Sequence, residues 1–560
     1  MNLLGKAHDP AFWTAVRETE TYKSYRDEQL SLWERATKDY LPECLRYSEF
    51  KMFWTTGNRS IYEKPYFNRR HLAINAAILS LIYPEEQKYI DKLMDLLYSI
   101  MDEYTWCLPA HQGKLEPNNN CRCDLFATET GFLLAEVDTL LRDRLDPLIH
   151  NRIMAETERR IIKPIFATEN YGWWERGHTN WTAVCMGSVA CTVMLLYPEL
   201  ADEKFIARAN ESMETFLGGF SDDGVCYEGC GYWGYGFGFF TVYADMVRTF
   251  TEGKIDFFKR DKVKLIATFP QRMFLTGNAG VSFSDGGRTI GYMTGLAHYL
   301  KSQYPDDVLV YSPKYGNNAG GKFSTNLRAA TWMVPEYKEN PADNTISTEF
   351  YAWDAQWLTK RTPNYGFAAK GGNNAEPHNH NDVGSFIYAK NGRQVLMDLG
   401  SGVYCRQYFA ADTRYGFLEC SSRGHSVPMI GETYQFTGKD AKATEAKYEN
   451  GVLSMNIAGA YKCEGLDRID RSFTFTEDTV TLTDTFTYTG TEQITDRIVT
   501  FLKAEITAEN TVTVEDTTIT FDPAQVEASV TTEQSSRDVA VYLIDFKLKP
   551  GVNTFTCTIK

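Results

Sequence analysis

The sequence predicts a multidomain α + β protein in which an N-terminal (α/α) toroid of helical hairpins precedes a C-terminal antiparallel β-sandwich. Three observations favour this fold class. The chain has 560 residues, which is too long for a single hydrophobic core. Apolar residues recur with a helical period as far as about residue 335, and they alternate with a period of two after about residue 345.

The helical pattern is clearest in the first 200 residues. Residues 70–101 and 124–141 place apolar side chains at i, i+3, i+4 and i+7, and residues 179–200 are apolar almost all round, as in an inner helix. A Tyr-Pro-acid sequence follows the pattern three times, at 81–86, 195–200 and 302–307. Proline ends one helix there and the acids favour the start of the next. Repeated hairpins of this kind indicate a toroid of paired helices.

The alternating pattern dominates the C-terminal part. Thr and charged residues alternate with apolar residues in three segments, 471–490, 511–521 and 539–548. Strands of this composition, separated by turn residues, are typical of an antiparallel sandwich. We therefore expect three parts: a toroid domain at 1–335, a linker at 336–345 and a β-sandwich domain at 346–560.

Composition and charge narrow the class of protein. The net charge of −15 argues against a general nucleic-acid-binding protein, since phosphate binding needs a basic surface. No apolar run reaches membrane-spanning length, so we expect no membrane partner. The N-terminal residues lack the basic and apolar regions of a secretory signal, which predicts a cytoplasmic protein. An export segment removed from the sequence would instead place it in the periplasm or outside the cell.

The predicted β-sandwich domain, residues 346–560, contains three histidines, and they lie close together in the sequence at His378, His380 and His425. Residues 376–386 read EPHNHNDVGSF, and on a strand His378, His380 and Asp382 would share one face. Two histidines and a carboxylate such as Asp398 suit Zn²⁺ or Mn²⁺, with one coordination position open to water. The spacing also fits a polar loop in which hydrogen bonds satisfy the histidines.

Two stretches of the helical half also contain candidate functional residues. Residues 222–240 are rich in glycine and tyrosine and include the acid Glu228, which favours either close approach to a ligand or an aromatic turn before a core helix. Residues 171–184 place Arg176, His178 and Asn180 directly before the inner helix. Such polar groups can meet an anion at a helix N-terminus, or Thr179 or Asn180 can simply cap the helix.

Together and in this order, these stretches resemble the heparinase II/III-like polysaccharide lyases. The most specific parts are DG…EG-x-x-Y at 223–232, H-N-H-N-D-x-G-S-F at 378–386, and the later Asp398 and His425. The resemblance covers most of the chain. It implies an (α/α) toroid followed by a β-sandwich, and it implies cleavage of uronic-acid-containing glycans by β-elimination.

The resemblance also implies roles for single residues. Tyr232 matches the tyrosine that protonates the leaving glycosidic oxygen and, for some substrates, removes the C5 proton. Asn180 matches a residue that helps hold the uronate carboxylate, and His378 matches a base or neutralising group. His178 lies close to a matched position and is a further catalytic candidate. His380, Asp398 and His425 match a divalent metal site, zinc in some relatives, with a structural or supporting role.

Substrate contacts are implied less directly. Tyr404 resembles a substrate-contacting tyrosine, and four further candidates are Glu228, Arg176, Trp181 and Arg423. The chain departs from the pattern at Gly236, where some relatives carry a basic residue four positions after the catalytic tyrosine. Contacts to carboxylate or sulfate groups then come from other positions, with Arg176, Arg288, Arg414 and Arg423 as candidates.

We therefore expect a lyase whose partner is an anionic oligo- or polysaccharide that contains uronate. Glycosaminoglycans such as heparan sulfate, chondroitin or hyaluronan are favoured, and an alginate or oligoalginate lyase is an alternative of the same architecture. A toroid glycoside hydrolase would need two carboxylates, with Glu175, Asp223 and Glu228 as candidates. A non-catalytic glycan-binding protein is the third class, and a homo-oligomer is left open.

Overall fold

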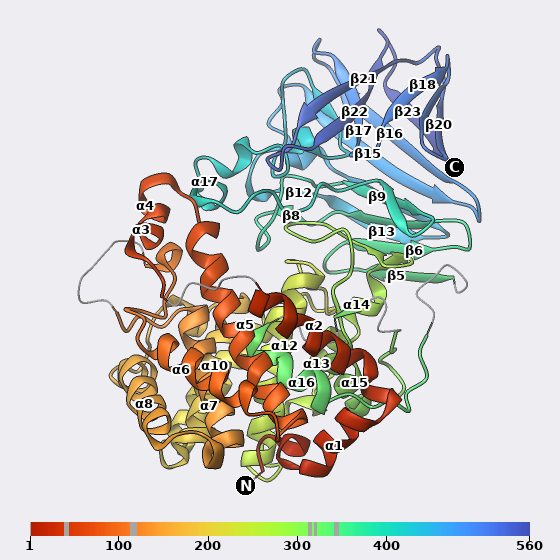
Figure 1. Ribbon diagram of the computed structural model, residues 1–560. Helices are drawn as coiled ribbons and strands as arrows, with labels where there is room; N and C mark the ends of the chain where they lie inside the picture. The colour runs from red at the N-terminus through yellow and green to blue at the C-terminus, as the bar shows by residue number, and fades with distance from the viewer. Residues whose placement is uncertain (1, 39–43, 113–119, 312–315, 318–321, 341–346) are drawn as a thin grey trace. The chain divides into compact units, whose positions relative to one another are not determined.

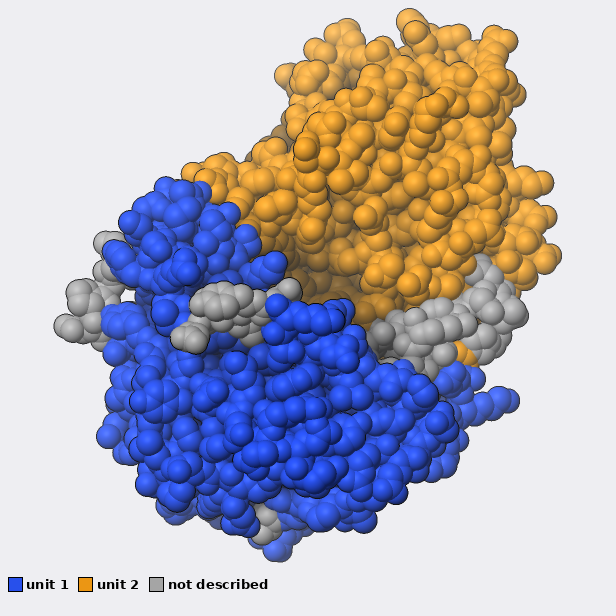
Figure 2. All heavy atoms as spheres, viewed as in Figure 1, with its two compact units in different colours: residues 1–219, 233–264, 292–339 blue, residues 220–232, 265–291, 340–560 orange. Residues whose placement is uncertain are grey.

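The computed structural model describes residues 2–38, 44–112, 120–311, 316–317, 322–340 and 347–560. The chain forms two compact units (Figure 2). Unit 1 contains residues 1–219, 233–264 and 292–339, and unit 2 contains residues 220–232, 265–291 and 340–560. The domain limits expected from the sequence stay a prediction, and residues 341–345 of the predicted linker lie outside the described residues.

Unit 1 is built from helices that pack against each other in pairs (Figure 1). α5 (Ser60–Ile82) packs on α6 (Gln87–Met101), and α10 (Asn180–Leu196) packs on both α7 (Leu125–Leu141) and α11 (Glu203–Leu217). α7 and α10 are buried on almost every side, whereas α6 and α11 bury one apolar face. Inner and outer helices thus form the (α/α) toroid that the sequence predicts.

The other described α-helices are α1 (Pro10–Glu18), α2 (Lys23–Lys38), α3 (Tyr47–Phe50), α4 (Met52–Thr56), α8 (Pro147–Thr157), α9 (Lys163–Phe166), α12 (Cys230–Phe250), α13 (Asp261–Ala267), α14 (Phe269–Arg272), α15 (Thr294–Gln303), α16 (Asn326–Thr331) and α17 (Arg406–Phe409). A short parallel pair, β3 (Tyr292–Met293) and β4 (Gly316–Asn317), belongs to unit 1. Among the described helices, none combines the length and the apolar character that crossing a membrane requires.

The three Tyr-Pro-acid sequences end helices, as predicted. Tyr83, Tyr197 and Tyr304 are the C-cap residues of α5, α10 and α15. The backbone N–H of each tyrosine donates to the carbonyl four residues earlier, which completes the last helical turn. The proline that follows cannot continue the helix, because it lacks an N–H and fixes its own φ.

Unit 2 consists mainly of antiparallel sheets. One sheet has the strand order β13 (Thr444–Glu449), β14 (Val452–Asn456), β15 (Leu466–Phe475), β16 (Val480–Tyr488), β23 (Thr554–Ile559), β20 (Thr517–Phe521), β19 (Thr511–Val514) and β18 (Ala504–Ala508). A second has the order β10 (Arg393–Leu396), β9 (Phe386–Lys390), β7 (Gly366–Lys370), β6 (Trp357–Arg361) and β5 (Thr348–Ala352). A third has the order β11 (Met429–Ile430), β17 (Ile494–Thr500), β22 (Ala540–Leu548) and β21 (Val526–Gln534). Two short pairs complete the described strands: β1 (Phe274–Thr276) with β2 (Ala279–Gly280), and β8 (Asn373–Asn374) with β12 (Gly438–Lys442).

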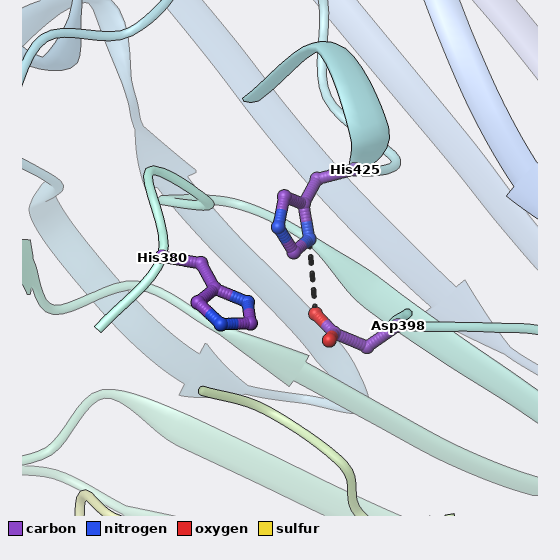
Figure 3. Close-up of side chains that lie close together, drawn as sticks. All are labelled: His380, Asp398 and His425. Atoms are coloured by element: carbon purple, nitrogen blue, oxygen red, sulfur yellow. Dashed lines mark ion pairs between the residues drawn. The ribbon is translucent and has the colours of Figure 1, made fainter. Parts of the chain in front are cut away.

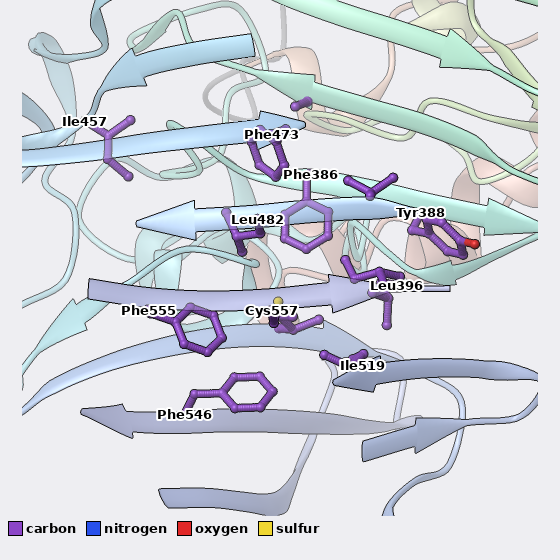
Figure 4. Close-up of a cluster of buried hydrophobic side chains, with 14 of the residues drawn as sticks. Phe386, Tyr388, Leu396, Ile457, Phe473, Leu482, Ile519, Phe546, Phe555 and Cys557 are labelled. Carbon is purple, nitrogen blue, oxygen red and sulfur yellow. The ribbon is translucent and has the colours of Figure 1, made fainter. Parts of the chain in front are cut away.

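The hydrophobic core of unit 2 draws side chains from all three of the larger sheets (Figure 4). Phe386 comes from β9, Phe473 from β15 and Phe546 from β22, and each is buried. In β16, Val480, Leu482 and Phe486 are buried, while Thr481, Thr483 and Thr485 are partly exposed. This alternation is the period of two that predicts the β-sandwich.

One buried ion pair in this unit fixes two loops. Arg471 on β15 is fully buried, and its guanidinium lies 2.5 Å from a carboxylate oxygen of Asp484. Its Nη1 donates to the backbone carbonyls of Gly384 and Ser426, at 2.8 and 2.7 Å. These carbonyls belong to the loops that carry His378, His380 and His425, so Arg471 ties both loops to strand β15.

Candidate active site

His378 and His380 lie in a loop that precedes β9, so of the two alternatives for residues 378–382, a strand or a polar loop, the structure shows the loop. His378 has a φ of 54°, in the left-handed region that residues other than glycine seldom adopt. The backbone N–H of Asn379 donates to the carbonyl of Glu376 at 3.1 Å, which closes a turn. Asn and Asp residues favour such turns through local hydrogen bonds, and this preference overrides the alternation of residue types.

Arg414 fastens the turn. Its Nη2 donates to the backbone carbonyls of His378 and Asn379, both at 3.1 Å, and its Nη1 donates to the carbonyl of Tyr408 at 3.2 Å. These contacts use three of the five N–H groups of the guanidinium, so a contact of Arg414 to a substrate carboxylate stays a prediction. The contacts hold His378 in an unfavourable backbone conformation, which is a common feature of functional sites.

The centre of the site is Asp285, which the sequence did not single out. Its carboxylate lies 2.6 Å from Nδ1 of His378 and 3.1 Å from Nε2 of His380. It also accepts from the hydroxyl of Tyr408 at 2.5 Å and lies 3.3 Å from Nη2 of Arg414. One buried carboxylate therefore orients two histidines, a tyrosine and an arginine.

This arrangement shifts the titration of the groups involved. Burial alone would raise the pKa of the Asp285 carboxyl, but hydrogen bonds from His378 and His380 lower that pKa well below its usual range. Burial lowers the pKa of His380, but the hydrogen bond to Asp285 outweighs it and contributes to a raised pKa of about 10. Asp285 is therefore ionised at neutral pH and accepts a hydrogen bond from each of the two imidazole rings.

Tyr232 contacts His378 directly. It lies in the first turn of α12, and its ring stacks on the imidazole of His378 with centroids 4.4 Å apart and planes 29° apart. Its hydroxyl lies 3.0 Å from the hydroxyl of Tyr404. Burial, with the nearby Tyr232 and Asp285, raises the pKa of Tyr404 well above its ordinary value, so Tyr404 stays protonated and can donate to Tyr232.

Glu228 completes the cluster in unit 2, because its Oε1 lies 3.5 Å from Nε2 of His378. The structure thus brings together four residues that the sequence proposes as catalytic or substrate-binding: Tyr232, His378, Tyr404 and Glu228. The sequence did not point to Asp285, because 93 residues separate it from His378. The surrounding residues, SDGG at 284–287, match none of the motifs considered. No local spacing could have indicated it.

The predicted metal ligands His380, Asp398 and His425 also lie together, and one ligand atom from each residue lies within 4.8 Å of the others (Figure 3). All three residues are buried. Nδ1 of His425 lies 3.0 Å from Oδ2 of Asp398, but neither atom makes a well-oriented hydrogen bond within the described part of the chain, and the same is true of Nδ1 of His380. Three buried atoms that could bind a metal ion, and that lack hydrogen-bond partners among the described residues, thus lie close to one another.

The second nitrogen of each ring explains this orientation. Nε2 of His425 donates to the backbone carbonyl of Glu419 at 2.8 Å, and Nε2 of His380 donates to Asp285. Without a metal, the hydrogen bond to Asp285 favours the protonated ring of His380, so a metal ion would displace the proton on Nδ1 and leave Nε2 protonated. In a neutral ring with its proton on Nε2, Nδ1 presents a lone pair. Histidine ligands of metals are usually held in this manner by a carbonyl or a carboxylate. The residues present therefore fit a divalent cation.

The remaining candidates of the helical half belong to unit 1. Asn180 is the first residue of α10 and is buried, and its Oδ1 has no hydrogen-bond partner among the described residues. His178 is exposed and its Nδ1 lies 2.8 Å from the carbonyl of Thr215. Trp181 packs edge-on against His111 and tilted against Trp173, and Arg176 pairs with Glu211 at 3.2 Å.

Gly236 has a structural reason to lack a side chain. A Cβ at this position would lie 3.1 Å from both Cα and Cβ of Asn180 and from the ring of Phe216. Such distances are shorter than ordinary van der Waals contacts, so a basic side chain at 236 would displace Asn180. The departure from the lyase pattern therefore accompanies close packing of α12 on α10.

Two other arginine candidates have partners elsewhere in unit 2. Arg423 lies 3.4 Å from a carboxylate oxygen of Glu533 on β21. The guanidinium of Arg288 lies over the ring of Phe501, 4.7 Å from its centroid. Neither is recorded in contact with Tyr232 or His378 in the part of the chain that the structure describes.

The chain is similar to known proteins in its structure, whereas its sequence shows no match. No family model matches the sequence, and no curated protein matches it. A mutant of heparan sulfate lyase HepC from Pedobacter heparinus is similar with a TM-score of 0.59 and 13% identity, over 100% of this chain and 87% of that one. Heparinase III is similar with a TM-score of 0.59 and 13% identity, over 100% and 93% of the two chains.

The chondroitin AC lyase of Streptomyces coelicolor A3, in complex with chondroitin sulphate, is similar with a TM-score of 0.56 and 11% identity, over 100% of this chain and 82% of that one. These likenesses extend over the helical and the sheet regions alike. The chain therefore has the heparinase-like polysaccharide lyase fold, an (α/α) toroid followed by antiparallel sheets.

Proposed function

We propose that this protein is a lyase that cleaves uronic-acid-containing glycans by β-elimination, with glycosaminoglycans as the favoured substrates. The observation that carries the proposal is the contact of Tyr232 with both His378 and Tyr404. The fold adds support, since the similar structures include proteins named as heparan sulfate lyase and chondroitin AC lyase. Alginate, which also consists of uronic acid residues, is the second candidate substrate.

The reaction needs an acid, a base and a group that neutralises the uronate carboxylate. The C5 hydrogen lies next to that carboxylate and is a weak carbon acid. When a base removes it, its bonding electrons form the C4=C5 double bond, and the C4–O bond breaks with its electrons on the leaving oxygen. Tyr232 donates its proton to that oxygen. Hydrogen bonds to the carboxylate stabilise the enolate-like intermediate, as an oxyanion hole does.

The neighbours of Tyr232 suit it to this role. Once Tyr232 has lost its proton, the protonated Tyr404 can donate to the phenolate oxygen, and such a hydrogen bond stabilises the charged form. The same hydrogen bond would support Tyr232 as the base. Asp285 holds the proton of His378 at Nδ1, so Nε2 is the atom available to the C5 proton or the carboxylate.

Asn180 is the proposed contact of the uronate carboxylate. Its buried amide oxygen lacks a partner among the described residues, and an unsatisfied buried polar group usually has a functional explanation. Asn and Gln amides have oxygen and nitrogen ends that are assigned from their hydrogen bonds, so the amide can present its NH₂ end to a carboxylate. Asn180 belongs to unit 1, and its place in the reaction stays a prediction.

We further propose that His380, Asp398 and His425 hold a divalent metal, zinc or manganese. When bound, the metal would supply positive charge and a cross-link between the loops of residues 378–382, 398–400 and 425. His380 shares Asp285 with His378, so this cross-link would also steady the catalytic histidine.

Removing the metal should therefore lower the thermal stability. We expect plasma mass spectrometry to find about one divalent ion per chain, and we expect chelation to lower Tm until Zn²⁺ or Mn²⁺ is restored. Metal binding displaces protons from histidine ligands, so the affinity should rise with pH. The His425→Ala variant serves as the matched control, because a chelator should leave its Tm unchanged. A wild-type chain that holds no metal and ignores the chelator contradicts the assignment.

A glycoside hydrolase is less well supported by the carboxylates of the chain. Glu175 accepts hydrogen bonds from two of the three guanidinium nitrogens of Arg208, Nε at 2.5 Å and Nη2 at 2.8 Å. Asp223 accepts from the backbone N–H of Asp354 at 2.7 Å and from the hydroxyl of Ser221. Both acids are thus used to hold the fold, whereas hydrolysis needs two acids at the scissile bond.

The experiment that tests the proposed function is a screen of uronate polymers and oligomers for product absorbance. β-Elimination leaves a double bond conjugated with a carboxylate, which absorbs in the short-wavelength ultraviolet. Hydrolysis yields new reducing ends without this absorbance, and a non-catalytic binding protein yields neither. Absence of the absorbance on heparan sulfate, chondroitin, hyaluronan and alginate would rule the proposal out.

A further inference from the structure

Unit 1 contains a pocket of about 720 Å³ that includes none of the residues assigned to the reaction. This volume lies within the range that holds small ligands in proteins. We name it the α5–α6 pocket, after the helices that supply much of its wall. It is lined by Cys44, Leu45, Arg46, Tyr47, Phe50, Tyr62, Arg69, Tyr98, Ser99, Asp102, Glu103, Tyr104 and Gln112.

The buried guanidinium groups at the pocket outnumber the buried carboxylates, because Arg70, which is not part of the lining, shares Glu103 with Arg69. Arg69 is almost fully buried, and its Nη1 lies 3.5 Å from Oε1 of Glu103 without making a hydrogen bond in the described part of the chain. The same carboxylate already accepts two hydrogen bonds from Arg70, at 3.2 and 2.7 Å. One carboxylate therefore balances two guanidinium groups, and a buried N–H of Arg69 stays unsatisfied. A buried charge of this kind favours an anionic ligand.

The outer part of the lining is aromatic. The side chains of Tyr47, Tyr98 and Tyr104 are 65%, 47% and 51% exposed, which is unusual for large rings. Phe50 is buried between Tyr62 and Tyr104, with ring centroids 5.1 and 6.4 Å away. Exposed tyrosine rings offer flat apolar faces together with hydroxyl groups. Such faces suit the C–H surface of a sugar ring, whose edge carries hydroxyls.

We propose that the α5–α6 pocket binds an acidic sugar residue, with the carboxylate toward Arg69 and the ring against the tyrosines. The exposed Arg46, which makes no ion pair among the described residues, adds positive charge to the lining. The lining also contains Asp102, which pairs with Arg152 outside it at 2.7 Å, so Arg46 and Arg69 leave the surroundings of the pocket positive. Such a charge favours an anion although the net charge of the chain is −15. The choice of a uronate among acidic sugars rests on the proposed function.

Calorimetric titration of the full chain tests the pocket with two matched probes. Methyl β-D-glucuronide and methyl β-D-glucoside differ only in a carboxylate that replaces a hydroxymethyl group. We expect the glucuronide to bind about tenfold more tightly, as one charge-assisted hydrogen bond would give. The proposed active site can also bind a uronate. Variants of the pocket residues therefore show whether the heat measured on titration comes from binding in the pocket. Tyr47→Ala and Tyr104→Ala should each weaken glucuronide binding about fivefold through lost ring contact.

Two further variants sharpen the result. Arg46→Gln should narrow the preference for glucuronide over glucoside, because it removes a charge and little ring contact. Trp353→Ala in unit 2 is the matched control, since it deletes an aromatic ring that is 64% exposed and lies outside the pocket, and it should bind like wild type. Equal binding of the two probes, or unchanged glucuronide affinity in both tyrosine variants, would overturn the proposal.

The outcomes also separate this pocket from the proposed function. If no uronate glycan yields unsaturated product while glucuronide binding still depends on Tyr104, the lyase assignment fails and the pocket stands. If unsaturated product forms and the tyrosine variants bind glucuronide like wild type, the pocket fails and the lyase assignment stands.

Discussion

The Tyr232→Phe variant is expected to form unsaturated product roughly 10²–10⁴-fold more slowly than wild type, which is the range that a general acid contributes. The substitution removes the proton that the leaving oxygen needs, and it leaves the ring that stacks on His378 in place. The hydrogen bond to Tyr404 is lost, at a cost of about 1 kcal/mol in stability. Steady-state absorbance assays and thermal unfolding of the same preparation measure both effects.

Tyr434→Phe is the matched control for this variant. Tyr434 is a half-buried tyrosine of unit 2 whose hydroxyl lies 3.2 Å from Glu432, away from His378 and Tyr404. Losing that hydroxyl should leave kcat and KM unchanged. If Tyr232→Phe keeps full activity, Tyr232 is not the acid, whatever the behaviour of the control.

The Asp285→Asn variant should lose comparable activity for a different reason. The carboxylate accepts from His378, His380, Tyr408 and Arg414, and an amide replaces one of its accepting oxygens with an NH₂ group that faces these donors. Loss of an orienting carboxylate behind a catalytic histidine costs about 10⁴ in kcat in other enzymes. We therefore expect kcat to fall by roughly 10²–10⁴ with a smaller change in KM, because Asp285 acts through His378.

The same change should also destabilise unit 2, since breaking a buried ion pair typically costs about 3–5 kcal/mol. Asp545→Asn provides the comparison: Asp545 is a buried carboxylate paired with Arg497 at 2.7 and 2.8 Å, and neither is recorded in contact with His378. It should lose stability and keep kcat. Nitrogen-15 spectra of His378 in the folded proteins report its tautomer, and an Asp285→Asn chain with unaltered tautomer and kcat would refute the positioning role.

Much of the fold follows from the sequence because its determinants are local. Hydrophobic periodicity identifies α7 and α10, and proline after Tyr83, Tyr197 and Tyr304 marks where helices end. Alternation in residues 471–490 identifies β15 and β16. These features depend on residues that are neighbours along the chain.

The site could be predicted only in part, because its geometry depends on contacts between distant segments. The order of motifs pointed to Tyr232, His378 and Tyr404, which the structure brings together. Asp285 could not be found in this way, since its partners come from a loop 93 residues later and from Tyr408 beyond it. The sequence left a strand and a loop open at His378, because alternation does not reveal a left-handed backbone conformation.

The most direct test of the central claim is the mass of the products formed from a defined uronate oligosaccharide. The account predicts two fragments whose masses add up to that of the substrate, with a vinylic C4 proton in the fragment that carries the uronate at its new end. Fragments that together exceed the substrate by the mass of one water, without the vinylic proton, would show hydrolysis and contradict the assignment of Tyr232 and His378 to an elimination.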